Sequence, residues 1–71
     1  MERVRVDSIT DYFALGKIIR EGKELPGQIH ISNITNGYVK NINEHLKEGQ
    51  VVDVKIIKYN QRRKVWELAC I

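Results

Sequence analysis

Several features that define common protein classes are scarce in this 71-residue sequence. Its one cysteine, Cys70, cannot form an intramolecular disulfide, which fits a reducing compartment. No apolar run approaches the ~20 residues that a membrane-spanning helix needs, and the N-terminus lacks the apolar core of a signal peptide. We therefore expect a cytoplasmic protein with no membrane partner.

Catalytic and metal-binding patterns are missing as well. The sequence has no Cys-x-x-Cys or His-x-x-x-His pair, no Gly-x-Ser-x-Gly elbow and no Gly-rich phosphate loop. Its two histidines, His30 and His45, lie far apart, and no thiol or carboxylate pair is arranged around them. We therefore expect no enzymatic activity, no metal, no cofactor and no small-molecule substrate.

The composition that remains is that of a small basic globular domain. Hydrophobic residues make up 42% and charged residues 30%, which predicts one domain over residues 1–71. The net charge of +3 permits nucleic acid as a partner without requiring it. Residues 58–64 carry four cations and no acid. Such a run is usually a solvated turn, but beside a binding face it can hold phosphates.

Alternation of apolar and polar residues predicts five short strands. Gly16 interrupts the second strand and predicts a bend or a bulge there. The polar segment 20–26 predicts a loop. The five expected strands begin with Val4 and Val6 and continue through residues 12–19, 28–31, 52–56 and 65–68.

Between the third and fourth strands the sequence favours helical turns. Ser32 can cap one such turn, although Asn36-Gly37 also has the chemistry of a two-residue hairpin turn. Asn41, followed three residues later by Glu44, forms a capping box and predicts a short helix over residues 42–47. Five strands with a helix between the third and the fourth describe an all-β, five-stranded oligonucleotide-binding (OB) barrel.

Two segments carry a resemblance to a known family. Pro26-Gly-Gln-Ile-His-Ile-Ser32 reads as a short strand with a Gly-x-x-His-x-Ser ending, and residues 46–57 match a Leu-x-x-Gly-x-x-Val-x-Val-Lys-Val segment. On these residues the chain resembles the S1 RNA-binding domain, strongly from Gly27 to Ala69. Residues 36–46 are most similar to the short bacterial single-domain members known as general stress proteins. The resemblance implies an S1-type OB barrel.

The resemblance also implies a binding face. Tyr12 is similar to an exposed aromatic that begins the family's second strand and stacks on bases, although a core or rim role is the alternative. His30 matches the motif histidine, which faces RNA from the third strand, where a plain surface histidine is the alternative. Strand alternation sends Ile29 and Ile31 to the other face. Lys17 can extend the basic run of residues 58–64 into a track for phosphates, and an ordinary solubilising lysine is the alternative.

The chain departs from the family pattern at three places. Leu15 replaces a second stacking ring, and Phe13 either rotates outward to compensate or fills core volume near Gly16. Asn60 replaces the usual aspartate and loses its charge. Val65 stands where a basic residue is usual, and the charge can come instead from the preceding loop, from Arg62, Arg63 and Lys64.

Trp66 shares its strand parity with Leu68, which predicts that it is buried in the core rather than stacked on RNA. Truncating a buried tryptophan costs about 3–5 kcal/mol. We therefore expect Trp66 to report folding.

The resemblance implies a non-catalytic monomer that binds single-stranded RNA with little sequence preference. By the same analogy it associates with the ribosome or messenger RNA and modulates translation or a stress response. One alternative is a protein-binding barrel that uses Tyr12, Phe13 and Leu15 as an apolar patch. Another is a module of a larger RNA-processing or translation protein, which Met1 and the late start of the first strand leave open.

Overall fold

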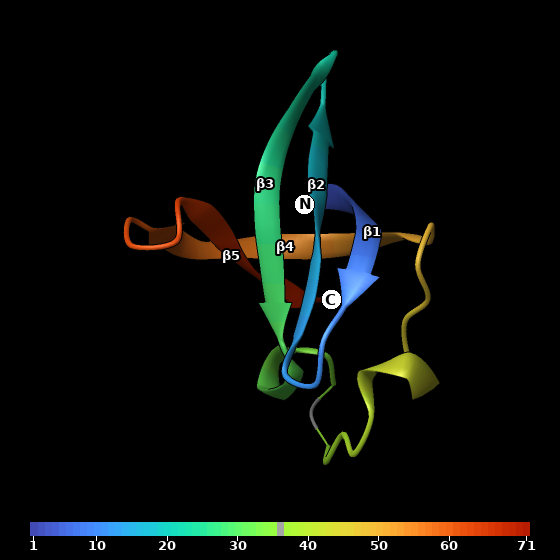
Figure 1. Ribbon diagram of the computed structural model, residues 1–71. Helices are drawn as coiled ribbons and strands as arrows, with labels where there is room; N and C mark the ends of the chain where they lie inside the picture. The colour runs from blue at the N-terminus through green and yellow to red at the C-terminus, as the bar shows by residue number, and fades with distance from the viewer. Residues whose placement is uncertain (36) are drawn as a thin grey trace.

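The chain closes into a five-stranded barrel with the strand order β1-β2-β3-β5-β4 (Figure 1). This computed structural model describes residues 1–35 and 37–71. β4 pairs with β1 and closes the barrel, while β3 and β5 pair in parallel. The prediction of an all-β, five-stranded OB barrel is confirmed. The strands are β1 (Glu2–Ile9), β2 (Phe13–Arg20), β3 (Lys23–His30), β4 (Val51–Asn60) and β5 (Val65–Cys70).

The core lies inside the barrel and follows the period-two alternation of the strands. Each strand contributes branched or small apolar side chains to the core, and so does the segment between β3 and β4. Figure 1 shows this segment below the barrel. Because inward residues alternate with outward ones, the remaining positions of each strand form the outer face. The buried cluster contains Val4, Val6, Ala14, Ile18, Ile29, Ile34, Val39, Ile42, Leu46, Val54 and Leu68.

The irregularity expected at Gly16 lies in the facing strand. Gly16 is opposite Val6 and Leu15 is opposite Ser8, so Asp7 is the extra residue of a bulge in β1. A Cβ placed on Gly16 would lie 2.0 Å from the backbone oxygen of Arg5. The glycine therefore permits a close backbone approach that lets the barrel turn here.

The prediction of a loop over residues 20–26 is wrong. The turn consists of Glu21 and Gly22, whose φ values are +42° and +78°. A two-residue hairpin turn of type I′ needs positive φ at both residues for its twist to match the twist of the flanking strands. β3 therefore starts at Lys23, and the β2–β3 hairpin extends beyond the other strands (Figure 1). Pro26 is tolerated because pairing of β3 with β5 begins only at Gly27.

The predicted helix over residues 42–47 is wrong in length and type. A single 3-10 turn, η2 (Ile42–Glu44), takes its place, and the Asn41 side chain makes no capping hydrogen bond. His45 N and Leu46 N both donate to Ile42 O at 2.9 Å. One turn already buries Ile42 and Leu46, so packing gives no reason to extend the helix.

The turn expected after the third strand is present, but Ser32 does not cap it. This 3-10 turn, η1 (Ile31–Asn33), is capped by His30, whose side chain accepts a hydrogen bond from Ser32 N. Imidazole nitrogen thus replaces the expected hydroxyl as the acceptor. The alternative hairpin turn at Asn36-Gly37 lies in part outside the described residues.

The prediction that Trp66 is buried in the core is right in its strand parity and wrong in degree. Trp66 packs against the core cluster but is only half-buried, whereas Leu68 on the same face is completely buried. The Trp66 ring lies 4.9 Å from that of Tyr59, with the planes at 62°. Trp66 therefore stands at the margin of the core, beside Tyr59 of β4.

Candidate nucleic-acid interface

Two rings meet on the outer face where β2 begins and β3 ends. Phe13 and His30 are direct partners in the β2–β3 register, and their ring centroids lie 5.1 Å apart at 75°. This edge-to-face arrangement is a favoured geometry for aromatic rings. Phe13 therefore rotates outward to His30 and does not fill core volume near Gly16.

The imidazole of His30 is held in place by η1. Its Nδ1 accepts a hydrogen bond from Ser32 N at 3.1 Å and lies 2.7 Å from Ser32 Oγ. Because these contacts use Nδ1, the Nε2 edge takes no part in the cap. His30 thus combines an N-cap role with a fixed ring on the outer face.

Arg63 reaches the rings from the β4–β5 loop. Its guanidinium carbon lies 4.9 Å from the centroid of Phe13, within range of a cation–π interaction. The same group donates from Nη1 to Gln28 Oε1 at 3.2 Å. We call Phe13, Gln28, His30 and Arg63 the ring–guanidinium cluster. Its members come from β2, β3 and the β4–β5 loop, so barrel closure assembles it.

Asn60 positions Arg63 from the end of β4. Its Oδ1 accepts a hydrogen bond from Arg63 N at 3.0 Å, and its backbone oxygen accepts one from Lys64 N at 2.7 Å. Lys64 has a φ of +57°, which turns the chain back into β5. The Asn60 amide nitrogen donates to Glu67 Oε2 at 3.1 Å. The side chain of Asn60 therefore links the loop to β5.

The structure distributes the other expected site residues around this cluster. Leu15 lies opposite Gln28 and, by alternation, on the same face as Phe13, with Lys17 two residues further along. Tyr12 lies in the β1–β2 turn with 65% of its surface exposed. Arg62 and Lys64 are exposed in the β4–β5 loop.

Gln28 and Glu67 belong to this face, although the sequence pattern alone does not indicate a role for either. They are direct partners in the parallel β3–β5 register, and Gln28 is buried to 5% exposure beneath its neighbours. The alternation of Glu67 with Trp66 and Leu68 already indicates an outward side chain. Its neighbours across the barrel depend on the β3–β5 pairing, which a single sequence does not indicate.

Charge pairing distinguishes Arg63 from arginines elsewhere on the barrel. Arg5 donates hydrogen bonds to Glu24 at 2.9 Å and to Asp7 at 3.0 Å, and these bonds raise the pKa of its guanidinium. Arg20 contacts Glu2 at 2.9 Å, which lowers the pKa of that carboxyl. Within the described residues, no carboxylate lies within 4.0 Å of the Arg63 guanidinium. Its charge is available to an anionic ligand.

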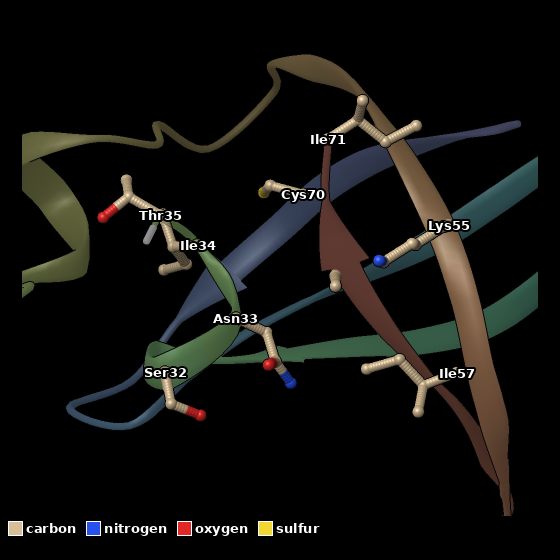
Figure 2. Close-up of a pocket in the computed structure, with 9 residues that line it drawn as sticks. Ser32, Asn33, Ile34, Thr35, Lys55, Ile57, Cys70 and Ile71 are labelled. Carbon is tan, nitrogen blue, oxygen red and sulfur yellow. The ribbon is translucent and has the colours of Figure 1, made fainter. Parts of the chain in front are cut away.

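A hollow of about 540 Å³ continues the outer face of β5 past Glu67. Figure 2 shows η1 residues on one side, Lys55 and Ile57 of β4 on the other, and the end of β5 between them. Ser32, the partner of His30, belongs to its rim. The hollow therefore lies next to the ring–guanidinium cluster. It is lined by Ser32, Asn33, Ile34, Thr35, Lys55, Ile57, Ala69, Cys70 and Ile71.

Among residues 1–35 and 37–71, no group of three or more His, Cys, Asp or Glu side chains is placed to hold a metal ion. Over the same residues, no helix is long and apolar enough to cross a membrane.

The five-stranded barrel, with two rings and a guanidinium on its outer face, places this protein in the class of OB-fold domains. The family model described as "S1 RNA binding domain" matches residues 3–70. The chain therefore belongs to the S1 RNA-binding domain family, as its motifs predicted.

Relatives of this chain include proteins of translation and stress. General stress protein 13 of Bacillus subtilis is 37% identical over 60 residues, which cover 84% of this chain and 46% of that protein. Translation initiation factor 2 subunit alpha of Thermoplasma volcanium is 39% identical over 66 residues, covering 93% of this chain and 26% of that protein. The chain therefore spans less than half the length of either relative.

A solved structure shows the same fold. The crystal structure of the a/eIF2alpha–aDim2p–rRNA complex from Pyrococcus horikoshii contains a chain that superposes with a TM-score of 0.81 and 33% sequence identity. The match covers 97% of this chain and 40% of that chain.

Proposed function

We propose that this chain binds single-stranded RNA on the outer face of β2, β3 and β5, without catalysing a reaction. The observation that carries the proposal is the ring–guanidinium cluster, in which Arg63 stands 4.9 Å over Phe13 beside His30. Rings and guanidinium planes on which bases stack, next to cations that hold phosphates, are how OB barrels bind single strands.

The surroundings of the cluster supply the rest of such a site. Arg62 and Lys64 are exposed beside Arg63 in the loop, and Lys17 lies further along β2 on the same face as Phe13. Each can meet a phosphate of a strand that crosses the rings. Stacking and phosphate contacts are available from every nucleotide, which supports binding with little sequence preference. Tyr12, exposed beside Phe13 in sequence, offers a further ring.

The contacts of Phe13 disfavour the protein-binding alternative. An apolar patch of Tyr12, Phe13 and Leu15 would have to present Phe13 to a partner. Instead the Arg63 guanidinium covers this ring and anchors itself to Gln28. A charged group over the centre of the patch favours an anionic partner over an apolar one.

An amide chemical-shift titration of the labelled chain with a short single-stranded RNA tests the proposal. We expect shifts at Phe13, Leu15, His30 and residues 60–64 that weaken strongly between low and moderate salt. Binding that holds or strengthens with salt would point to an apolar interface instead. An unperturbed spectrum at millimolar RNA would contradict the proposal.

We propose further that the RNA belongs to translation. The relatives named above include a translation initiation factor subunit and a general stress protein, and one structural neighbour was solved in a complex with rRNA. The corresponding setting for this chain is a cytoplasmic monomer that associates with ribosomes or messenger RNA and modulates translation or a stress response. Co-sedimentation with ribosomal subunits at low and high salt tests the association, and light scattering tests the monomer.

A further inference from the structure

Glu67 places a carboxylate in the middle of the proposed RNA face. In the strand register it lies between Gln28 of β3 and Lys58 of β4, and Gln28 in turn is opposite Leu15 of β2. Residues paired in this way project to the same side of a sheet. A negative charge at this position repels phosphates, so it does not contribute to backbone binding.

The Glu67 carboxylate is fixed on one side and open on the other. Its Oε2 accepts a hydrogen bond from the Asn60 amide at 3.1 Å, and Asn60 is itself held by Arg63 N. Among the described residues, no arginine or lysine lies within 4.0 Å of the carboxylate. Glu67 is half-buried, so the acceptor that remains is oriented and partly shielded from water.

The open acceptor lies close to the proposed stacking position. The Arg63 side chain spans from the Phe13 ring to Gln28, which is the direct neighbour of Glu67. A base stacked beside Arg63 would have one edge on the side of Gln28 and Glu67. An ionised carboxylate only accepts hydrogen bonds, so it selects base edges that donate.

Resting on the proposed RNA binding, we propose that Glu67 is a specificity-determining residue that favours bases with an exocyclic amino group over uracil. Cytosine offers its N4 amino group to the carboxylate. Uracil offers only N3–H, which stands between two carbonyl oxygens that a carboxylate repels. Stacking remains tolerant of sequence, and Glu67 adds a preference at one nucleotide.

The test measures the affinities of the decamers rC10 and rU10 by fluorescence anisotropy at one low salt concentration. We expect the unchanged chain to bind rC10 roughly tenfold more tightly than rU10. Glu67→Gln keeps an oxygen for the Asn60 amide but adds a donor, so the ratio should fall to about twofold or less. Glu48→Gln removes the same charge from an exposed position outside the face and should leave the ratio unchanged.

The outcomes separate this inference from the proposed function. Salt-sensitive binding of both decamers with an equal affinity would overturn the role of Glu67 and leave RNA binding intact. A preference for rC10 that survives in Glu67→Gln, with an unchanged circular dichroism spectrum, would also overturn it. Absence of salt-sensitive binding to either decamer would overturn the proposed function and this inference together.

Discussion

The backbone oxygen of Arg5 occupies the space where a side chain on Gly16 would begin. A Cβ at that position would lie 2.0 Å from the oxygen and 2.9 Å from its carbonyl carbon. No flexible side chain can move aside to relieve such a contact, because both atoms belong to the backbone of β1. The close approach of β1 and β2 next to the Asp7 bulge therefore requires glycine.

We expect Gly16→Ala to lower the free energy of unfolding by about 3 kcal/mol, because the strands must separate to admit the methyl group. Urea denaturation followed by circular dichroism measures the loss. Gly37→Ala is the matched control, since its Cβ would meet nothing closer than Thr35 Oγ1 at 3.8 Å. That control should stay within about 0.5 kcal/mol of the unchanged chain. Equal stability of both variants would contradict the steric explanation.

Two substitutions of His30 should separate its contribution to stability from its contribution to RNA binding. His30→Ala removes both the cap on Ser32 N and the ring beside Phe13, and we expect a loss of about 2 kcal/mol of unfolding free energy. His30→Asn keeps an acceptor at the position of Nδ1 and should lose only about half as much. Urea denaturation measures both losses.

RNA affinity provides the second readout for the same two variants. We expect His30→Asn and His30→Ala to weaken binding of a short single-stranded RNA alike, because both lack the ring. If His30→Asn were as unstable as His30→Ala, the cap would not be the structural role. If it bound RNA as well as the unchanged chain, the imidazole would not belong to the interface.

Arg63 should carry one phosphate contact. Removing it in Arg63→Ala should reduce the slope of log affinity against log salt by about 0.7, whereas Arg63→Lys keeps the slope and loses affinity because an ammonium lacks the planar contact with Phe13. Affinity measured at several salt concentrations checks both. Lys47→Ala, exposed near η2, is the control and should leave the slope unchanged. An unchanged slope in Arg63→Ala would remove this residue from the phosphate track.

The thiol of Cys70 should resist alkylation at mildly alkaline pH. Burial raises the pKa of the thiol above its ordinary value, because the thiolate is poorly solvated there. The protonated thiol therefore contributes to stability below the pKa of the unfolded chain, and this contribution disappears as pH rises through the higher folded pKa. Iodoacetamide labelling rates over a pH series should inflect at higher pH in the folded chain than in urea. Coincident inflections would contradict the effect of burial.

The barrel could be predicted from the sequence because its core residues alternate with polar ones. Val4 with Val6 and Leu68 with Trp66 show the period of two that a half-buried strand requires. The start of β3 could not be predicted, because it depends on Glu21 adopting a positive φ that is unusual for a residue with a side chain. The short helix failed for a related reason: Asn41 stands at the N-cap position but its side chain makes no capping hydrogen bond, and core packing is complete after one turn.

The sequence indicates the direction of a site side chain where a local motif determines it. It does not indicate which side chains meet when that depends on pairing between distant strands. The motif around His30 indicates an outward ring, whereas the sequence left Phe13 open between the outer face and the core, and only its pairing with His30 in the structure decides between them. The positions of Gln28 and Glu67 relative to Arg63 depend on the parallel pairing of β3 with β5 and on the shape of one loop. Such long-range pairing has no local signature in a single sequence, and this is why the polar centre of the face emerged only from the structure.

The order in which the ribosome adds these residues determines when the ring–guanidinium cluster can assemble. Phe13 and His30 emerge early, whereas Arg63 follows Gln28, its hydrogen-bond partner, by 35 positions. A nascent chain released at Asn60 carries the rings, but it lacks the guanidinium and all of β5. Such a truncated product has an open barrel and no assembled site. Under the proposed function, the chain therefore gains the ability to bind RNA only when translation of the whole barrel is complete.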